Sequence, residues 1–273
     1  MHDPRDGPTL TARDLLALRF IGLGFEVAQY QLRAAIFQGL SEVVASRRVR
    51  RWLRLGLIAI ERWNGVGINR IRLTAAGRAA VVAAGLATED ELFVPRQAVQ
   101  PKDVCHTMWI NDLRVVAAEG LPIRADRIEP AWALQRRLAP SSPTLPGPLA
   151  IPDLLLVQKA RGGKRASIVA MEVDLGGERL ASTFVPKLGK LAGLLVEWAG
   201  PSARTWIVIL TRGPRRLESL RARVLEANVP VPVVAELLPE AAGAEALVAL
   251  RVLLSRGVQA SEQGNRVEVH ASV

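Results

Sequence analysis

The stretch LIAIERWNGVGINRIRLTAAGR, residues 57–78, decides the fold of the first part of the chain. Its opening, LIAIERW, predicts a strand, and INRIRL, residues 68–73, alternates apolar and polar side chains as a partner strand does. The Asn64-Gly65 step between them is typical of a tight hairpin turn. Thr74 can then cap a further helix. The stretch therefore predicts two antiparallel strands followed by a helix.

Three helices are predicted upstream of this hairpin. Thr11 is the expected cap of the first helix, and apolar side chains at helical spacing over residues 26–37 predict the second. Ser41 is the expected cap of the third helix, which extends to about Leu55. Three helices, a hairpin and one more helix form the pattern of a winged helix-turn-helix domain, which we place at residues 10–87.

The positive charge of the chain is concentrated in the same region. The chain has 36 Lys and Arg against 26 Asp and Glu, a net charge of +10, and residues 41–80 hold nine arginines against two glutamates, or +7 of it. In such domains one helix enters the major groove of DNA and a wing can contact the backbone. Double-stranded DNA is therefore the favoured partner, and a solvated basic face or a protein-docking module is the alternative. The predicted DNA-binding residues are Arg47, Arg48, Arg50, Arg51, Arg54, Arg70 and Arg72.

The second part of the chain predicts an α/β domain. We place it at residues 104–256, after a polar linker at 88–103 and before a loosely ordered tail at 257–273. Buried strands and amphipathic helices alternate through it. The predicted strands lie within 123–137 and at 153–157, 166–173, 205–210 and 231–235, and the predicted helices at 103–119, 186–198, 217–227 and 245–255.

Acidic residues stand at the ends of two of these strands. Asp153 opens one strand, and Glu172 and Asp174 close the next, where strand alternation directs both to one face. Carboxylates on adjacent strands can hold Mg²⁺ together with water, so Asp153 and Glu172 are the predicted metal ligands. Lys187 on the following helix, with Lys190 in reserve, can stabilise charge on a phosphate. The predicted catalytic residues are Asp153, Glu172, Asp174 and Lys187, and ordinary strand-end acids are the alternative.

The order helix, three strands, helix, strand over residues 103–212, with Pro-Asp at 152–153, resembles the PD-(D/E)xK nuclease fold. This resemblance implies a restriction-endonuclease-like α/β domain and a Mg²⁺ cofactor if the site is active. Asp174 stands where the lysine of the fold is expected, so the charge has to come from Lys187 or Lys190, or the domain does not cut DNA. The fold class is thus α/β, α+β overall, with the winged helix first.

Short motifs from both halves of the chain, within roughly 10–212, match one known family. They are Leu73-Thr74-x-x-Gly77, His106-Thr107, Asn111-Asp112, Pro152-Asp153, Glu172-Val173-Asp174 and Lys187. Both halves together resemble the replication-relaxation family of plasmids and integrative elements. This resemblance implies a DNA-binding protein of a mobile element that acts in its replication, relaxation or transfer. A homodimer and replication or transfer proteins are further possible partners. The alternatives are an active Mg²⁺-dependent DNA endonuclease and a transcription regulator or protein–protein adaptor.

Three residues of the predicted helix 103–119, His106, Asn111 and Asp112, leave alternatives open. His106 is either a general base near Asp153, or a group that orients a metal ligand there, or else a cap or packing residue, and we favour the cap or packing role. Asn111 and Asp112 either tie the helix to the sheet or belong to the site. Cys105 is expected to be buried and inert.

Composition excludes several other classes of protein. Hydrophobic residues make up 49% of the chain, which excludes a wholly disordered chain, and a single cysteine excludes an internal disulfide and a multi-cysteine zinc site. No apolar run reaches ~18 residues, so no membrane span is expected. The opening MHDPRDGPTL has no apolar signal region, and we expect a cytoplasmic protein.

Overall fold

The computed structural model describes residues 10–63, 68–94, 101–118, 125–138, 150–160, 162, 165–200, 202–240 and 243–262. The chain divides into two compact units, Met1–Asn111 and Asp112–Val273, and the dividing point lies within helix α5 (Pro101–Ala118). The hairpin turn predicted at Asn64-Gly65 lies outside the described residues. No helix in the described part of the chain is long and apolar enough to span a membrane.

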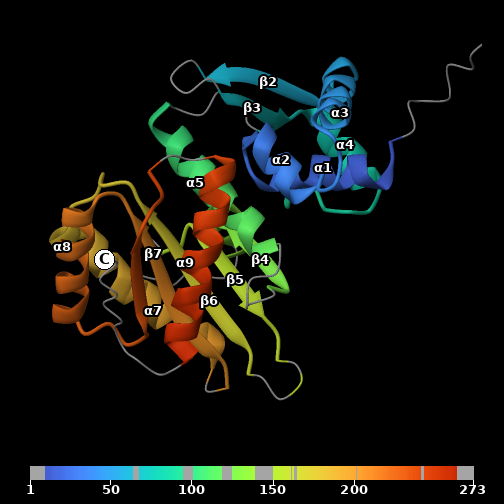
Figure 1. Ribbon diagram of the computed structural model, residues 1–273. Coiled ribbons are helices and arrows are strands. Elements are labelled where there is room, and N and C mark those ends of the chain that lie inside the picture. Colours follow the sequence, from blue (N-terminus) through green and yellow to red (C-terminus); the bar gives the residue numbers. More distant parts are fainter. Residues whose placement is uncertain are drawn as a thin grey trace, which may run out of the picture. The chain divides into compact units, whose positions relative to one another are not determined.

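The described residues of the first unit form a small antiparallel sheet with helices (Figure 1), in the strand order β1-β3-β2. Besides the first part of α5, its elements are α1 (Ala12–Leu23), β1 (Val27–Ala28), α2 (Gln29–Ala35), α3 (Glu42–Arg54), β2 (Ile58–Trp63), β3 (Ile68–Leu73) and α4 (Ala75–Ala83). The predicted order is confirmed with one correction. The helix expected from residue 26 begins only at Gln29, because Val27 and Ala28 pair with β3, and this pairing prevails over their helical spacing.

Each named residue of the sequence Leu73-Thr74-x-x-Gly77 has a structural role in the first unit. Leu73 is buried in the core of the first unit. Thr74 caps α4, because its Oγ1 accepts a hydrogen bond from the backbone N–H of Gly77 at 3.1 Å. A Cβ atom at position 77 would lie 2.1 Å from the carbonyl oxygen of Leu57, so glycine is required for α4 to pack this closely against the chain before β2.

Part of the predicted linker at residues 88–103 packs on the first unit. Leu92 is buried in the same core, and the ring of Phe93 stacks on Phe25 with 3.6 Å between ring centroids. Residues 95–100 of the predicted linker lie outside the described residues. The predicted domain limits stay predictions.

The described residues of the second unit form a mixed five-stranded sheet in the order β4-β5-β6-β7-β8. Strands β4, β5 and β6 are antiparallel to their neighbours in turn, whereas β6, β7 and β8 run parallel. Besides the last part of α5, the elements are β4 (Arg127–Pro130), α6 (Ala131–Leu138), β5 (Leu154–Gln158), β6 (Ser167–Asp174), the π-helix η2 (Leu180–Phe184), α7 (Val185–Ala199), β7 (Arg204–Thr211), α8 (Pro214–Glu226), β8 (Val233–Leu237) and α9 (Ala244–Glu262).

Three elements differ from the prediction for this unit. The π-helix η2 (Leu180–Phe184) lies where no element was predicted. Helix α6 directly follows Pro130, in a range where only a strand was expected. Helix α9 extends to Glu262, into the range predicted as a tail.

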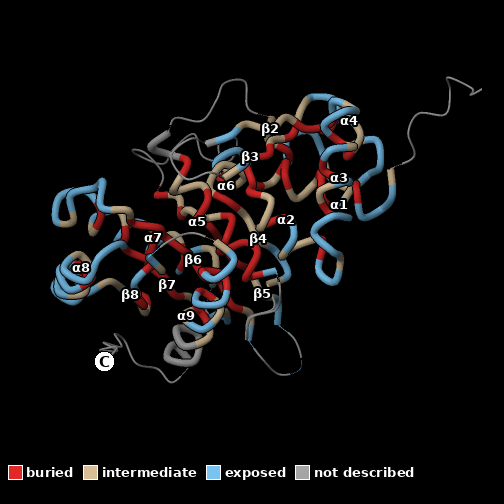
Figure 2. Tube along the Cα trace, turned by 45° about the horizontal axis from the view of Figure 1, so that its top comes forward, coloured by how far each residue is buried: buried red, intermediate tan, exposed pale blue. Residues whose placement is uncertain are grey.

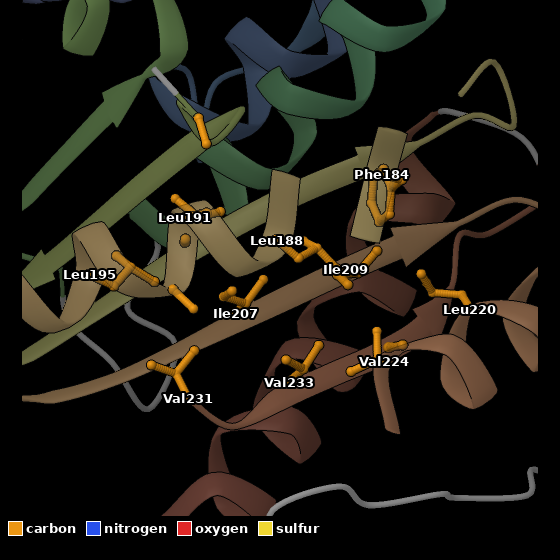
Figure 3. Packing of buried hydrophobic residues seen from close by; sticks show 14 of the residues in the cluster. Phe184, Leu188, Leu191, Leu195, Ile207, Ile209, Leu220, Val224, Val231 and Val233 are labelled. Carbon is orange, nitrogen blue, oxygen red and sulfur yellow. The ribbon is translucent and has the colours of Figure 1, made fainter. Parts of the chain in front are cut away.

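Strand β6 lies at the centre of the sheet and in the core of the second unit. All of β6 is buried, and so is most of β7, as the red tube in Figure 2 shows. Helices α7 and α8 cover one face of the sheet: Leu188 and Leu191 of α7 lie with Ile207 and Ile209 of β7 in a single apolar cluster (Figure 3). A polar side chain at the end of β6 on this face therefore meets α7 and α8.

Candidate functional site

The exposed side of α3 carries three arginines in one row. Trp52 and Val49 are buried on the other side of the helix. Arg47, Arg50 and Arg54 are exposed and lie three and four residues apart, which places them on one face of the helix, opposite Trp52. Within the described residues, none of the three forms an ion pair with a carboxylate. We call Arg47, Arg50 and Arg54 the arginine face. Arg51, half-buried, flanks it.

Arg48, although predicted to bind DNA, holds a buried carboxylate. Its Nη1 donates a hydrogen bond to Oδ1 of Asp14 at 2.8 Å, and the side chain of Asp14 is 1% exposed. Nε1 of Trp52 donates to the same oxygen at 3.1 Å. Burial alone would raise the pKa of Asp14, but hydrogen bonds from Thr11 and Arg48 bring it below its ordinary value. Arg48 therefore joins α3 to α1.

The predicted wing residues Arg70 and Arg72 are also paired. Arg70 donates to Glu26 at 2.9 Å and to Glu61 at 3.1 Å, and its side chain is 11% exposed. Arg72 pairs with the other oxygen of Glu61 at 2.8 Å. The register of β2 and β3 sets Glu61 directly opposite Arg70. Both arginines thus hold the sheet together, and we leave them out of the proposed DNA contacts.

Asp153, Glu172 and Lys187 come together in the second unit. Nζ of Lys187 on α7 donates to Oε2 of Glu172 at 2.7 Å, and the side chain of Glu172 is 2% exposed. Oδ2 of Asp153 accepts a hydrogen bond from the backbone N–H of Val173 at 2.8 Å. Since Leu154 pairs with Met171, the antiparallel register brings Asp153 beside Glu172.

The carboxyl group of Glu172 lies in an environment that disfavours its charged form. Burial, together with the charge of Asp153 and against the ammonium of Lys187, raises the pKa of Glu172 to about 8. Oε1 of Glu172 is buried and has no hydrogen-bond partner among the described residues. A buried acceptor without a partner is costly, and a cation beside this oxygen would remove that cost.

The donor set around Glu172 fits Mg²⁺. Among the described residues, no group of three or more His, Cys, Asp or Glu side chains gathers at one point. Mg²⁺ is commonly held by one or two carboxylates, with waters and substrate phosphates completing its shell. Asp153 and Glu172 would be those carboxylates.

Lys187 connects Glu172 to a cavity of about 480 Å³. Burial lowers the pKa of Lys187, but the carboxylate of Glu172 more than offsets it and the pKa lies above its ordinary value, so the amine is an ammonium. The volume is in the range of small-molecule pockets. Its lining consists of Ala131, Gln135, Ala150, Ile151, Glu178, Ser182, Thr183, Pro186, Lys187 and Lys190. Lys190 thus lies at the cavity, and no sequence motif indicated Gln135, Ser182 or Thr183.

Asp174 is held by other residues, although it lies on the same face of the sheet. Arg216 on α8 binds it with two nitrogens, at 2.7 and 2.9 Å. Thr211 donates its hydroxyl to Asp174 at 2.9 Å, as does the N–H of Gly176. Burial alone would raise the pKa of Asp174, but these hydrogen bonds bring it below its ordinary value. Asp174 therefore fastens the end of β6 to α8, and we leave it out of the proposed catalytic set.

The polar residues of α5 have mixed environments. Nδ2 of Asn111 donates to the carbonyl oxygens of Gly24 and Glu26, at 2.9 and 2.6 Å, and so ties α5 to the segment before β1. Asp112 is fully buried. Cys105 is half-buried rather than buried. His106 is half-buried as well, and its role stays a prediction.

No protein-family model and no curated protein matches this chain. Two solved structures are similar to it. One is the restriction endonuclease FokI, with a TM-score of 0.35, 11% identity and coverage of 97% of this chain and 49% of that chain. The other is FokI bound to DNA, with a TM-score of 0.29, 13% identity and coverage of 97% and 50%. The chain thus spans about half the length of FokI.

Proposed function

We propose that this chain binds duplex DNA through α3, with the first unit acting as a winged helix-turn-helix domain. The observation that carries the proposal is the arginine face. Arg47, Arg50 and Arg54 point away from the core, and no carboxylate among the described residues neutralises them. Arginine on an exposed helix suits both phosphate oxygens and the guanine edge. The order of helices and strands around α3, with a two-stranded hairpin directly after it, supports the same assignment.

The finer proposal is a protein of a plasmid or integrative element that acts in its replication, relaxation or transfer. It rests on the resemblance to the replication-relaxation family. The structural reasons found for Thr74 and Gly77 support the winged-helix part of that resemblance.

Affinity for a random-sequence duplex at low salt tests the DNA-binding proposal. The triple variant Arg47→Ala/Arg50→Ala/Arg54→Ala should bind roughly tenfold or more weakly, because phosphate contacts dominate such binding. The control Arg204→Ala/Arg215→Ala/Arg223→Ala removes the same charge from exposed positions of the second unit. Equal affinities of the two triple variants would contradict the proposal.

A second candidate function, a Mg²⁺-dependent DNA endonuclease of the PD-(D/E)xK type, is supported by the partnerless Oε1 of Glu172. Asp153 and Glu172 would hold the ion, and Lys187 would place an ammonium beside the scissile phosphate as charge develops on it. A bound Mg²⁺ would supply Lewis-acid stabilisation and a more acidic water. The cavity beside Lys187 would accommodate a phosphodiester strand next to these groups.

A plasmid-nicking assay in Mg²⁺ or Mn²⁺ tests this second candidate. Activity should be lost in Asp153→Asn, Glu172→Gln and Lys187→Met, and kept in the control Glu197→Gln, which removes an exposed carboxylate from α7. Activity that survives Asp153→Asn and Glu172→Gln would belong to another site or to a contaminant. A wild-type chain that binds DNA and does not cut it would be a binding protein, such as a regulator or adaptor.

A further inference from the structure

Val43 extends the arginine face toward the beginning of α3. Its side chain is 58% exposed, and it is the second residue of the helix. Val43 precedes Arg47 by four residues, so it lies in the same row as Arg47, Arg50 and Arg54. Folding does not require an apolar side chain there, because the buried side of α3 is formed by Ala45, Val49 and Trp52.

The position of Val43 on α3 distinguishes it from the other exposed apolar residues of this helix. Val44, 38% exposed, and Leu53, 43% exposed, lie to either side of the row rather than in it. Glu42, which begins the helix, is ion-paired with Arg33 of α2 at 3.4 Å. The row therefore begins with one apolar side chain and continues with three guanidinium groups.

We propose that Val43 and Arg47 determine sequence specificity, an inference that rests on the proposed DNA-binding function of α3. Val43 contacts the 5-methyl group of a thymine, and Arg47 donates to O6 and N7 of a guanine. In the major groove the thymine methyl is the apolar feature of the base edges, and arginine is the commonest partner of guanine. Residues near the N-terminus of a recognition helix are the ones that contact bases.

The spacing of the two side chains predicts the spacing of the two bases. Four residues of α-helix advance about 6 Å, at about 1.5 Å per residue. Successive base pairs of one strand are about 3.4 Å apart, so the thymine and the guanine should lie about two base steps apart. Arg50 and Arg54 lie one and two turns further along α3 and contact phosphates.

The test starts from short randomised duplexes selected with the whole 273-residue chain. Each thymine of the selected consensus is then replaced by deoxyuridine, which removes the 5-methyl group and leaves the protein unchanged. At one position the wild-type chain should lose about fourfold in affinity, the value of one buried methyl-sized group. Val43→Ala should lose a similar factor on the thymine duplex and show no further loss on the deoxyuridine duplex. The control Leu53→Ala should keep the full wild-type sensitivity.

Two results would overturn the inference. One is a selected consensus in which no deoxyuridine replacement weakens the wild-type chain, and the other is a Val43→Ala variant that keeps the wild-type sensitivity. In both cases duplex binding that still depends on Arg47 and Arg50 would leave the proposed function standing. A wild-type chain that binds no duplex at low salt would contradict the proposed function itself.

Discussion

Arg48 on α3 donates a hydrogen bond to the buried carboxylate of Asp14 on α1, with 2.8 Å between Nη1 and Oδ1. Arg47, its neighbour in the chain, is exposed and belongs to the arginine face. Adjacent arginines of one helix thus have separate tasks, because a step of one residue turns the side chain by about 100° around the helix axis.

The variants Arg48→Ala and Arg47→Ala should therefore have opposite phenotypes. Arg48→Ala removes the charged partner of a buried carboxylate and should lower the free energy of unfolding by about 1 to 3 kcal/mol. Arg47→Ala should leave stability unchanged and weaken DNA binding. Thermal unfolding and fluorescence anisotropy on the same samples measure both effects. If the two variants lost equal stability, the contact between Arg48 and Asp14 would contribute nothing to the free energy of unfolding.

Stability should fall with rising pH because of Glu172. Its pKa in the folded chain is raised from 4.5 to about 8, so folding favours the protonated form. The stabilisation is complete below pH 4.5 and is lost as the pH rises through 8. Relative to Glu172→Gln, the wild-type free energy of unfolding should decline by about 1 kcal/mol per pH unit between about pH 5 and pH 8. Urea unfolding without divalent metal measures this decline, and parallel pH curves for the two proteins would disprove it.

Asp174 should prove structural rather than catalytic. Arg216→Lys cannot reproduce the two-nitrogen contact with Asp174 and should lower the unfolding temperature, whereas Arg215→Lys, at an exposed position next to it, should not. The pKa of Asp174 is below 3.8, so its stabilisation is present above that pH and is lost on acidification. The deficit of Arg216→Lys should accordingly fade below pH 3.8. A deficit that persists unchanged in acid would point to a cause other than this carboxylate.

The sequence predicts local structure better than it predicts partners. Ser41 and Thr74 were identified as helix caps from residue type and position alone, and both accept the capping hydrogen bonds. The alternation around Arg70 correctly predicted a strand but could not show that Glu26 and Glu61 lie beside its side chain.

In the candidate site too, the sequence predicted local structure but not the partners of each side chain. Strand alternation correctly predicted that Glu172 and Asp174 lie on one face of the sheet. In the structure, both side chains contact helices that cover that face. That Lys187 meets Glu172 while Asp174 meets Arg216 depends on how α7 and α8 pack on the sheet, which the order of residues along the chain does not fix. The cavity residues Ser182 and Thr183 belong to a π-helix, a conformation too rare to be expected from composition.

Mg²⁺ should stabilise the folded chain without any DNA. Binding to the folded state alone raises the unfolding temperature in proportion to the logarithm of metal concentration. The increase should be absent in Asp153→Asn, present in Glu197→Gln, and larger at alkaline than at neutral pH, because Glu172 gives up a proton to bind the ion. A thermal-shift titration measures it, and an equal increase in Asp153→Asn would exclude Asp153 as a ligand.

The salt dependence of duplex binding tests the central claim most directly. The slope of log affinity against log salt changes by about 0.9 for each phosphate contact. If Arg47, Arg50 and Arg54 all contact phosphates, the triple alanine variant should have a slope about 2.7 shallower than the wild-type chain, and about 1.8 shallower if Arg47 contacts a base instead. The control Arg204→Ala/Arg215→Ala/Arg223→Ala should keep the wild-type slope. An unchanged slope in the α3 variant would contradict the claim that this helix holds DNA.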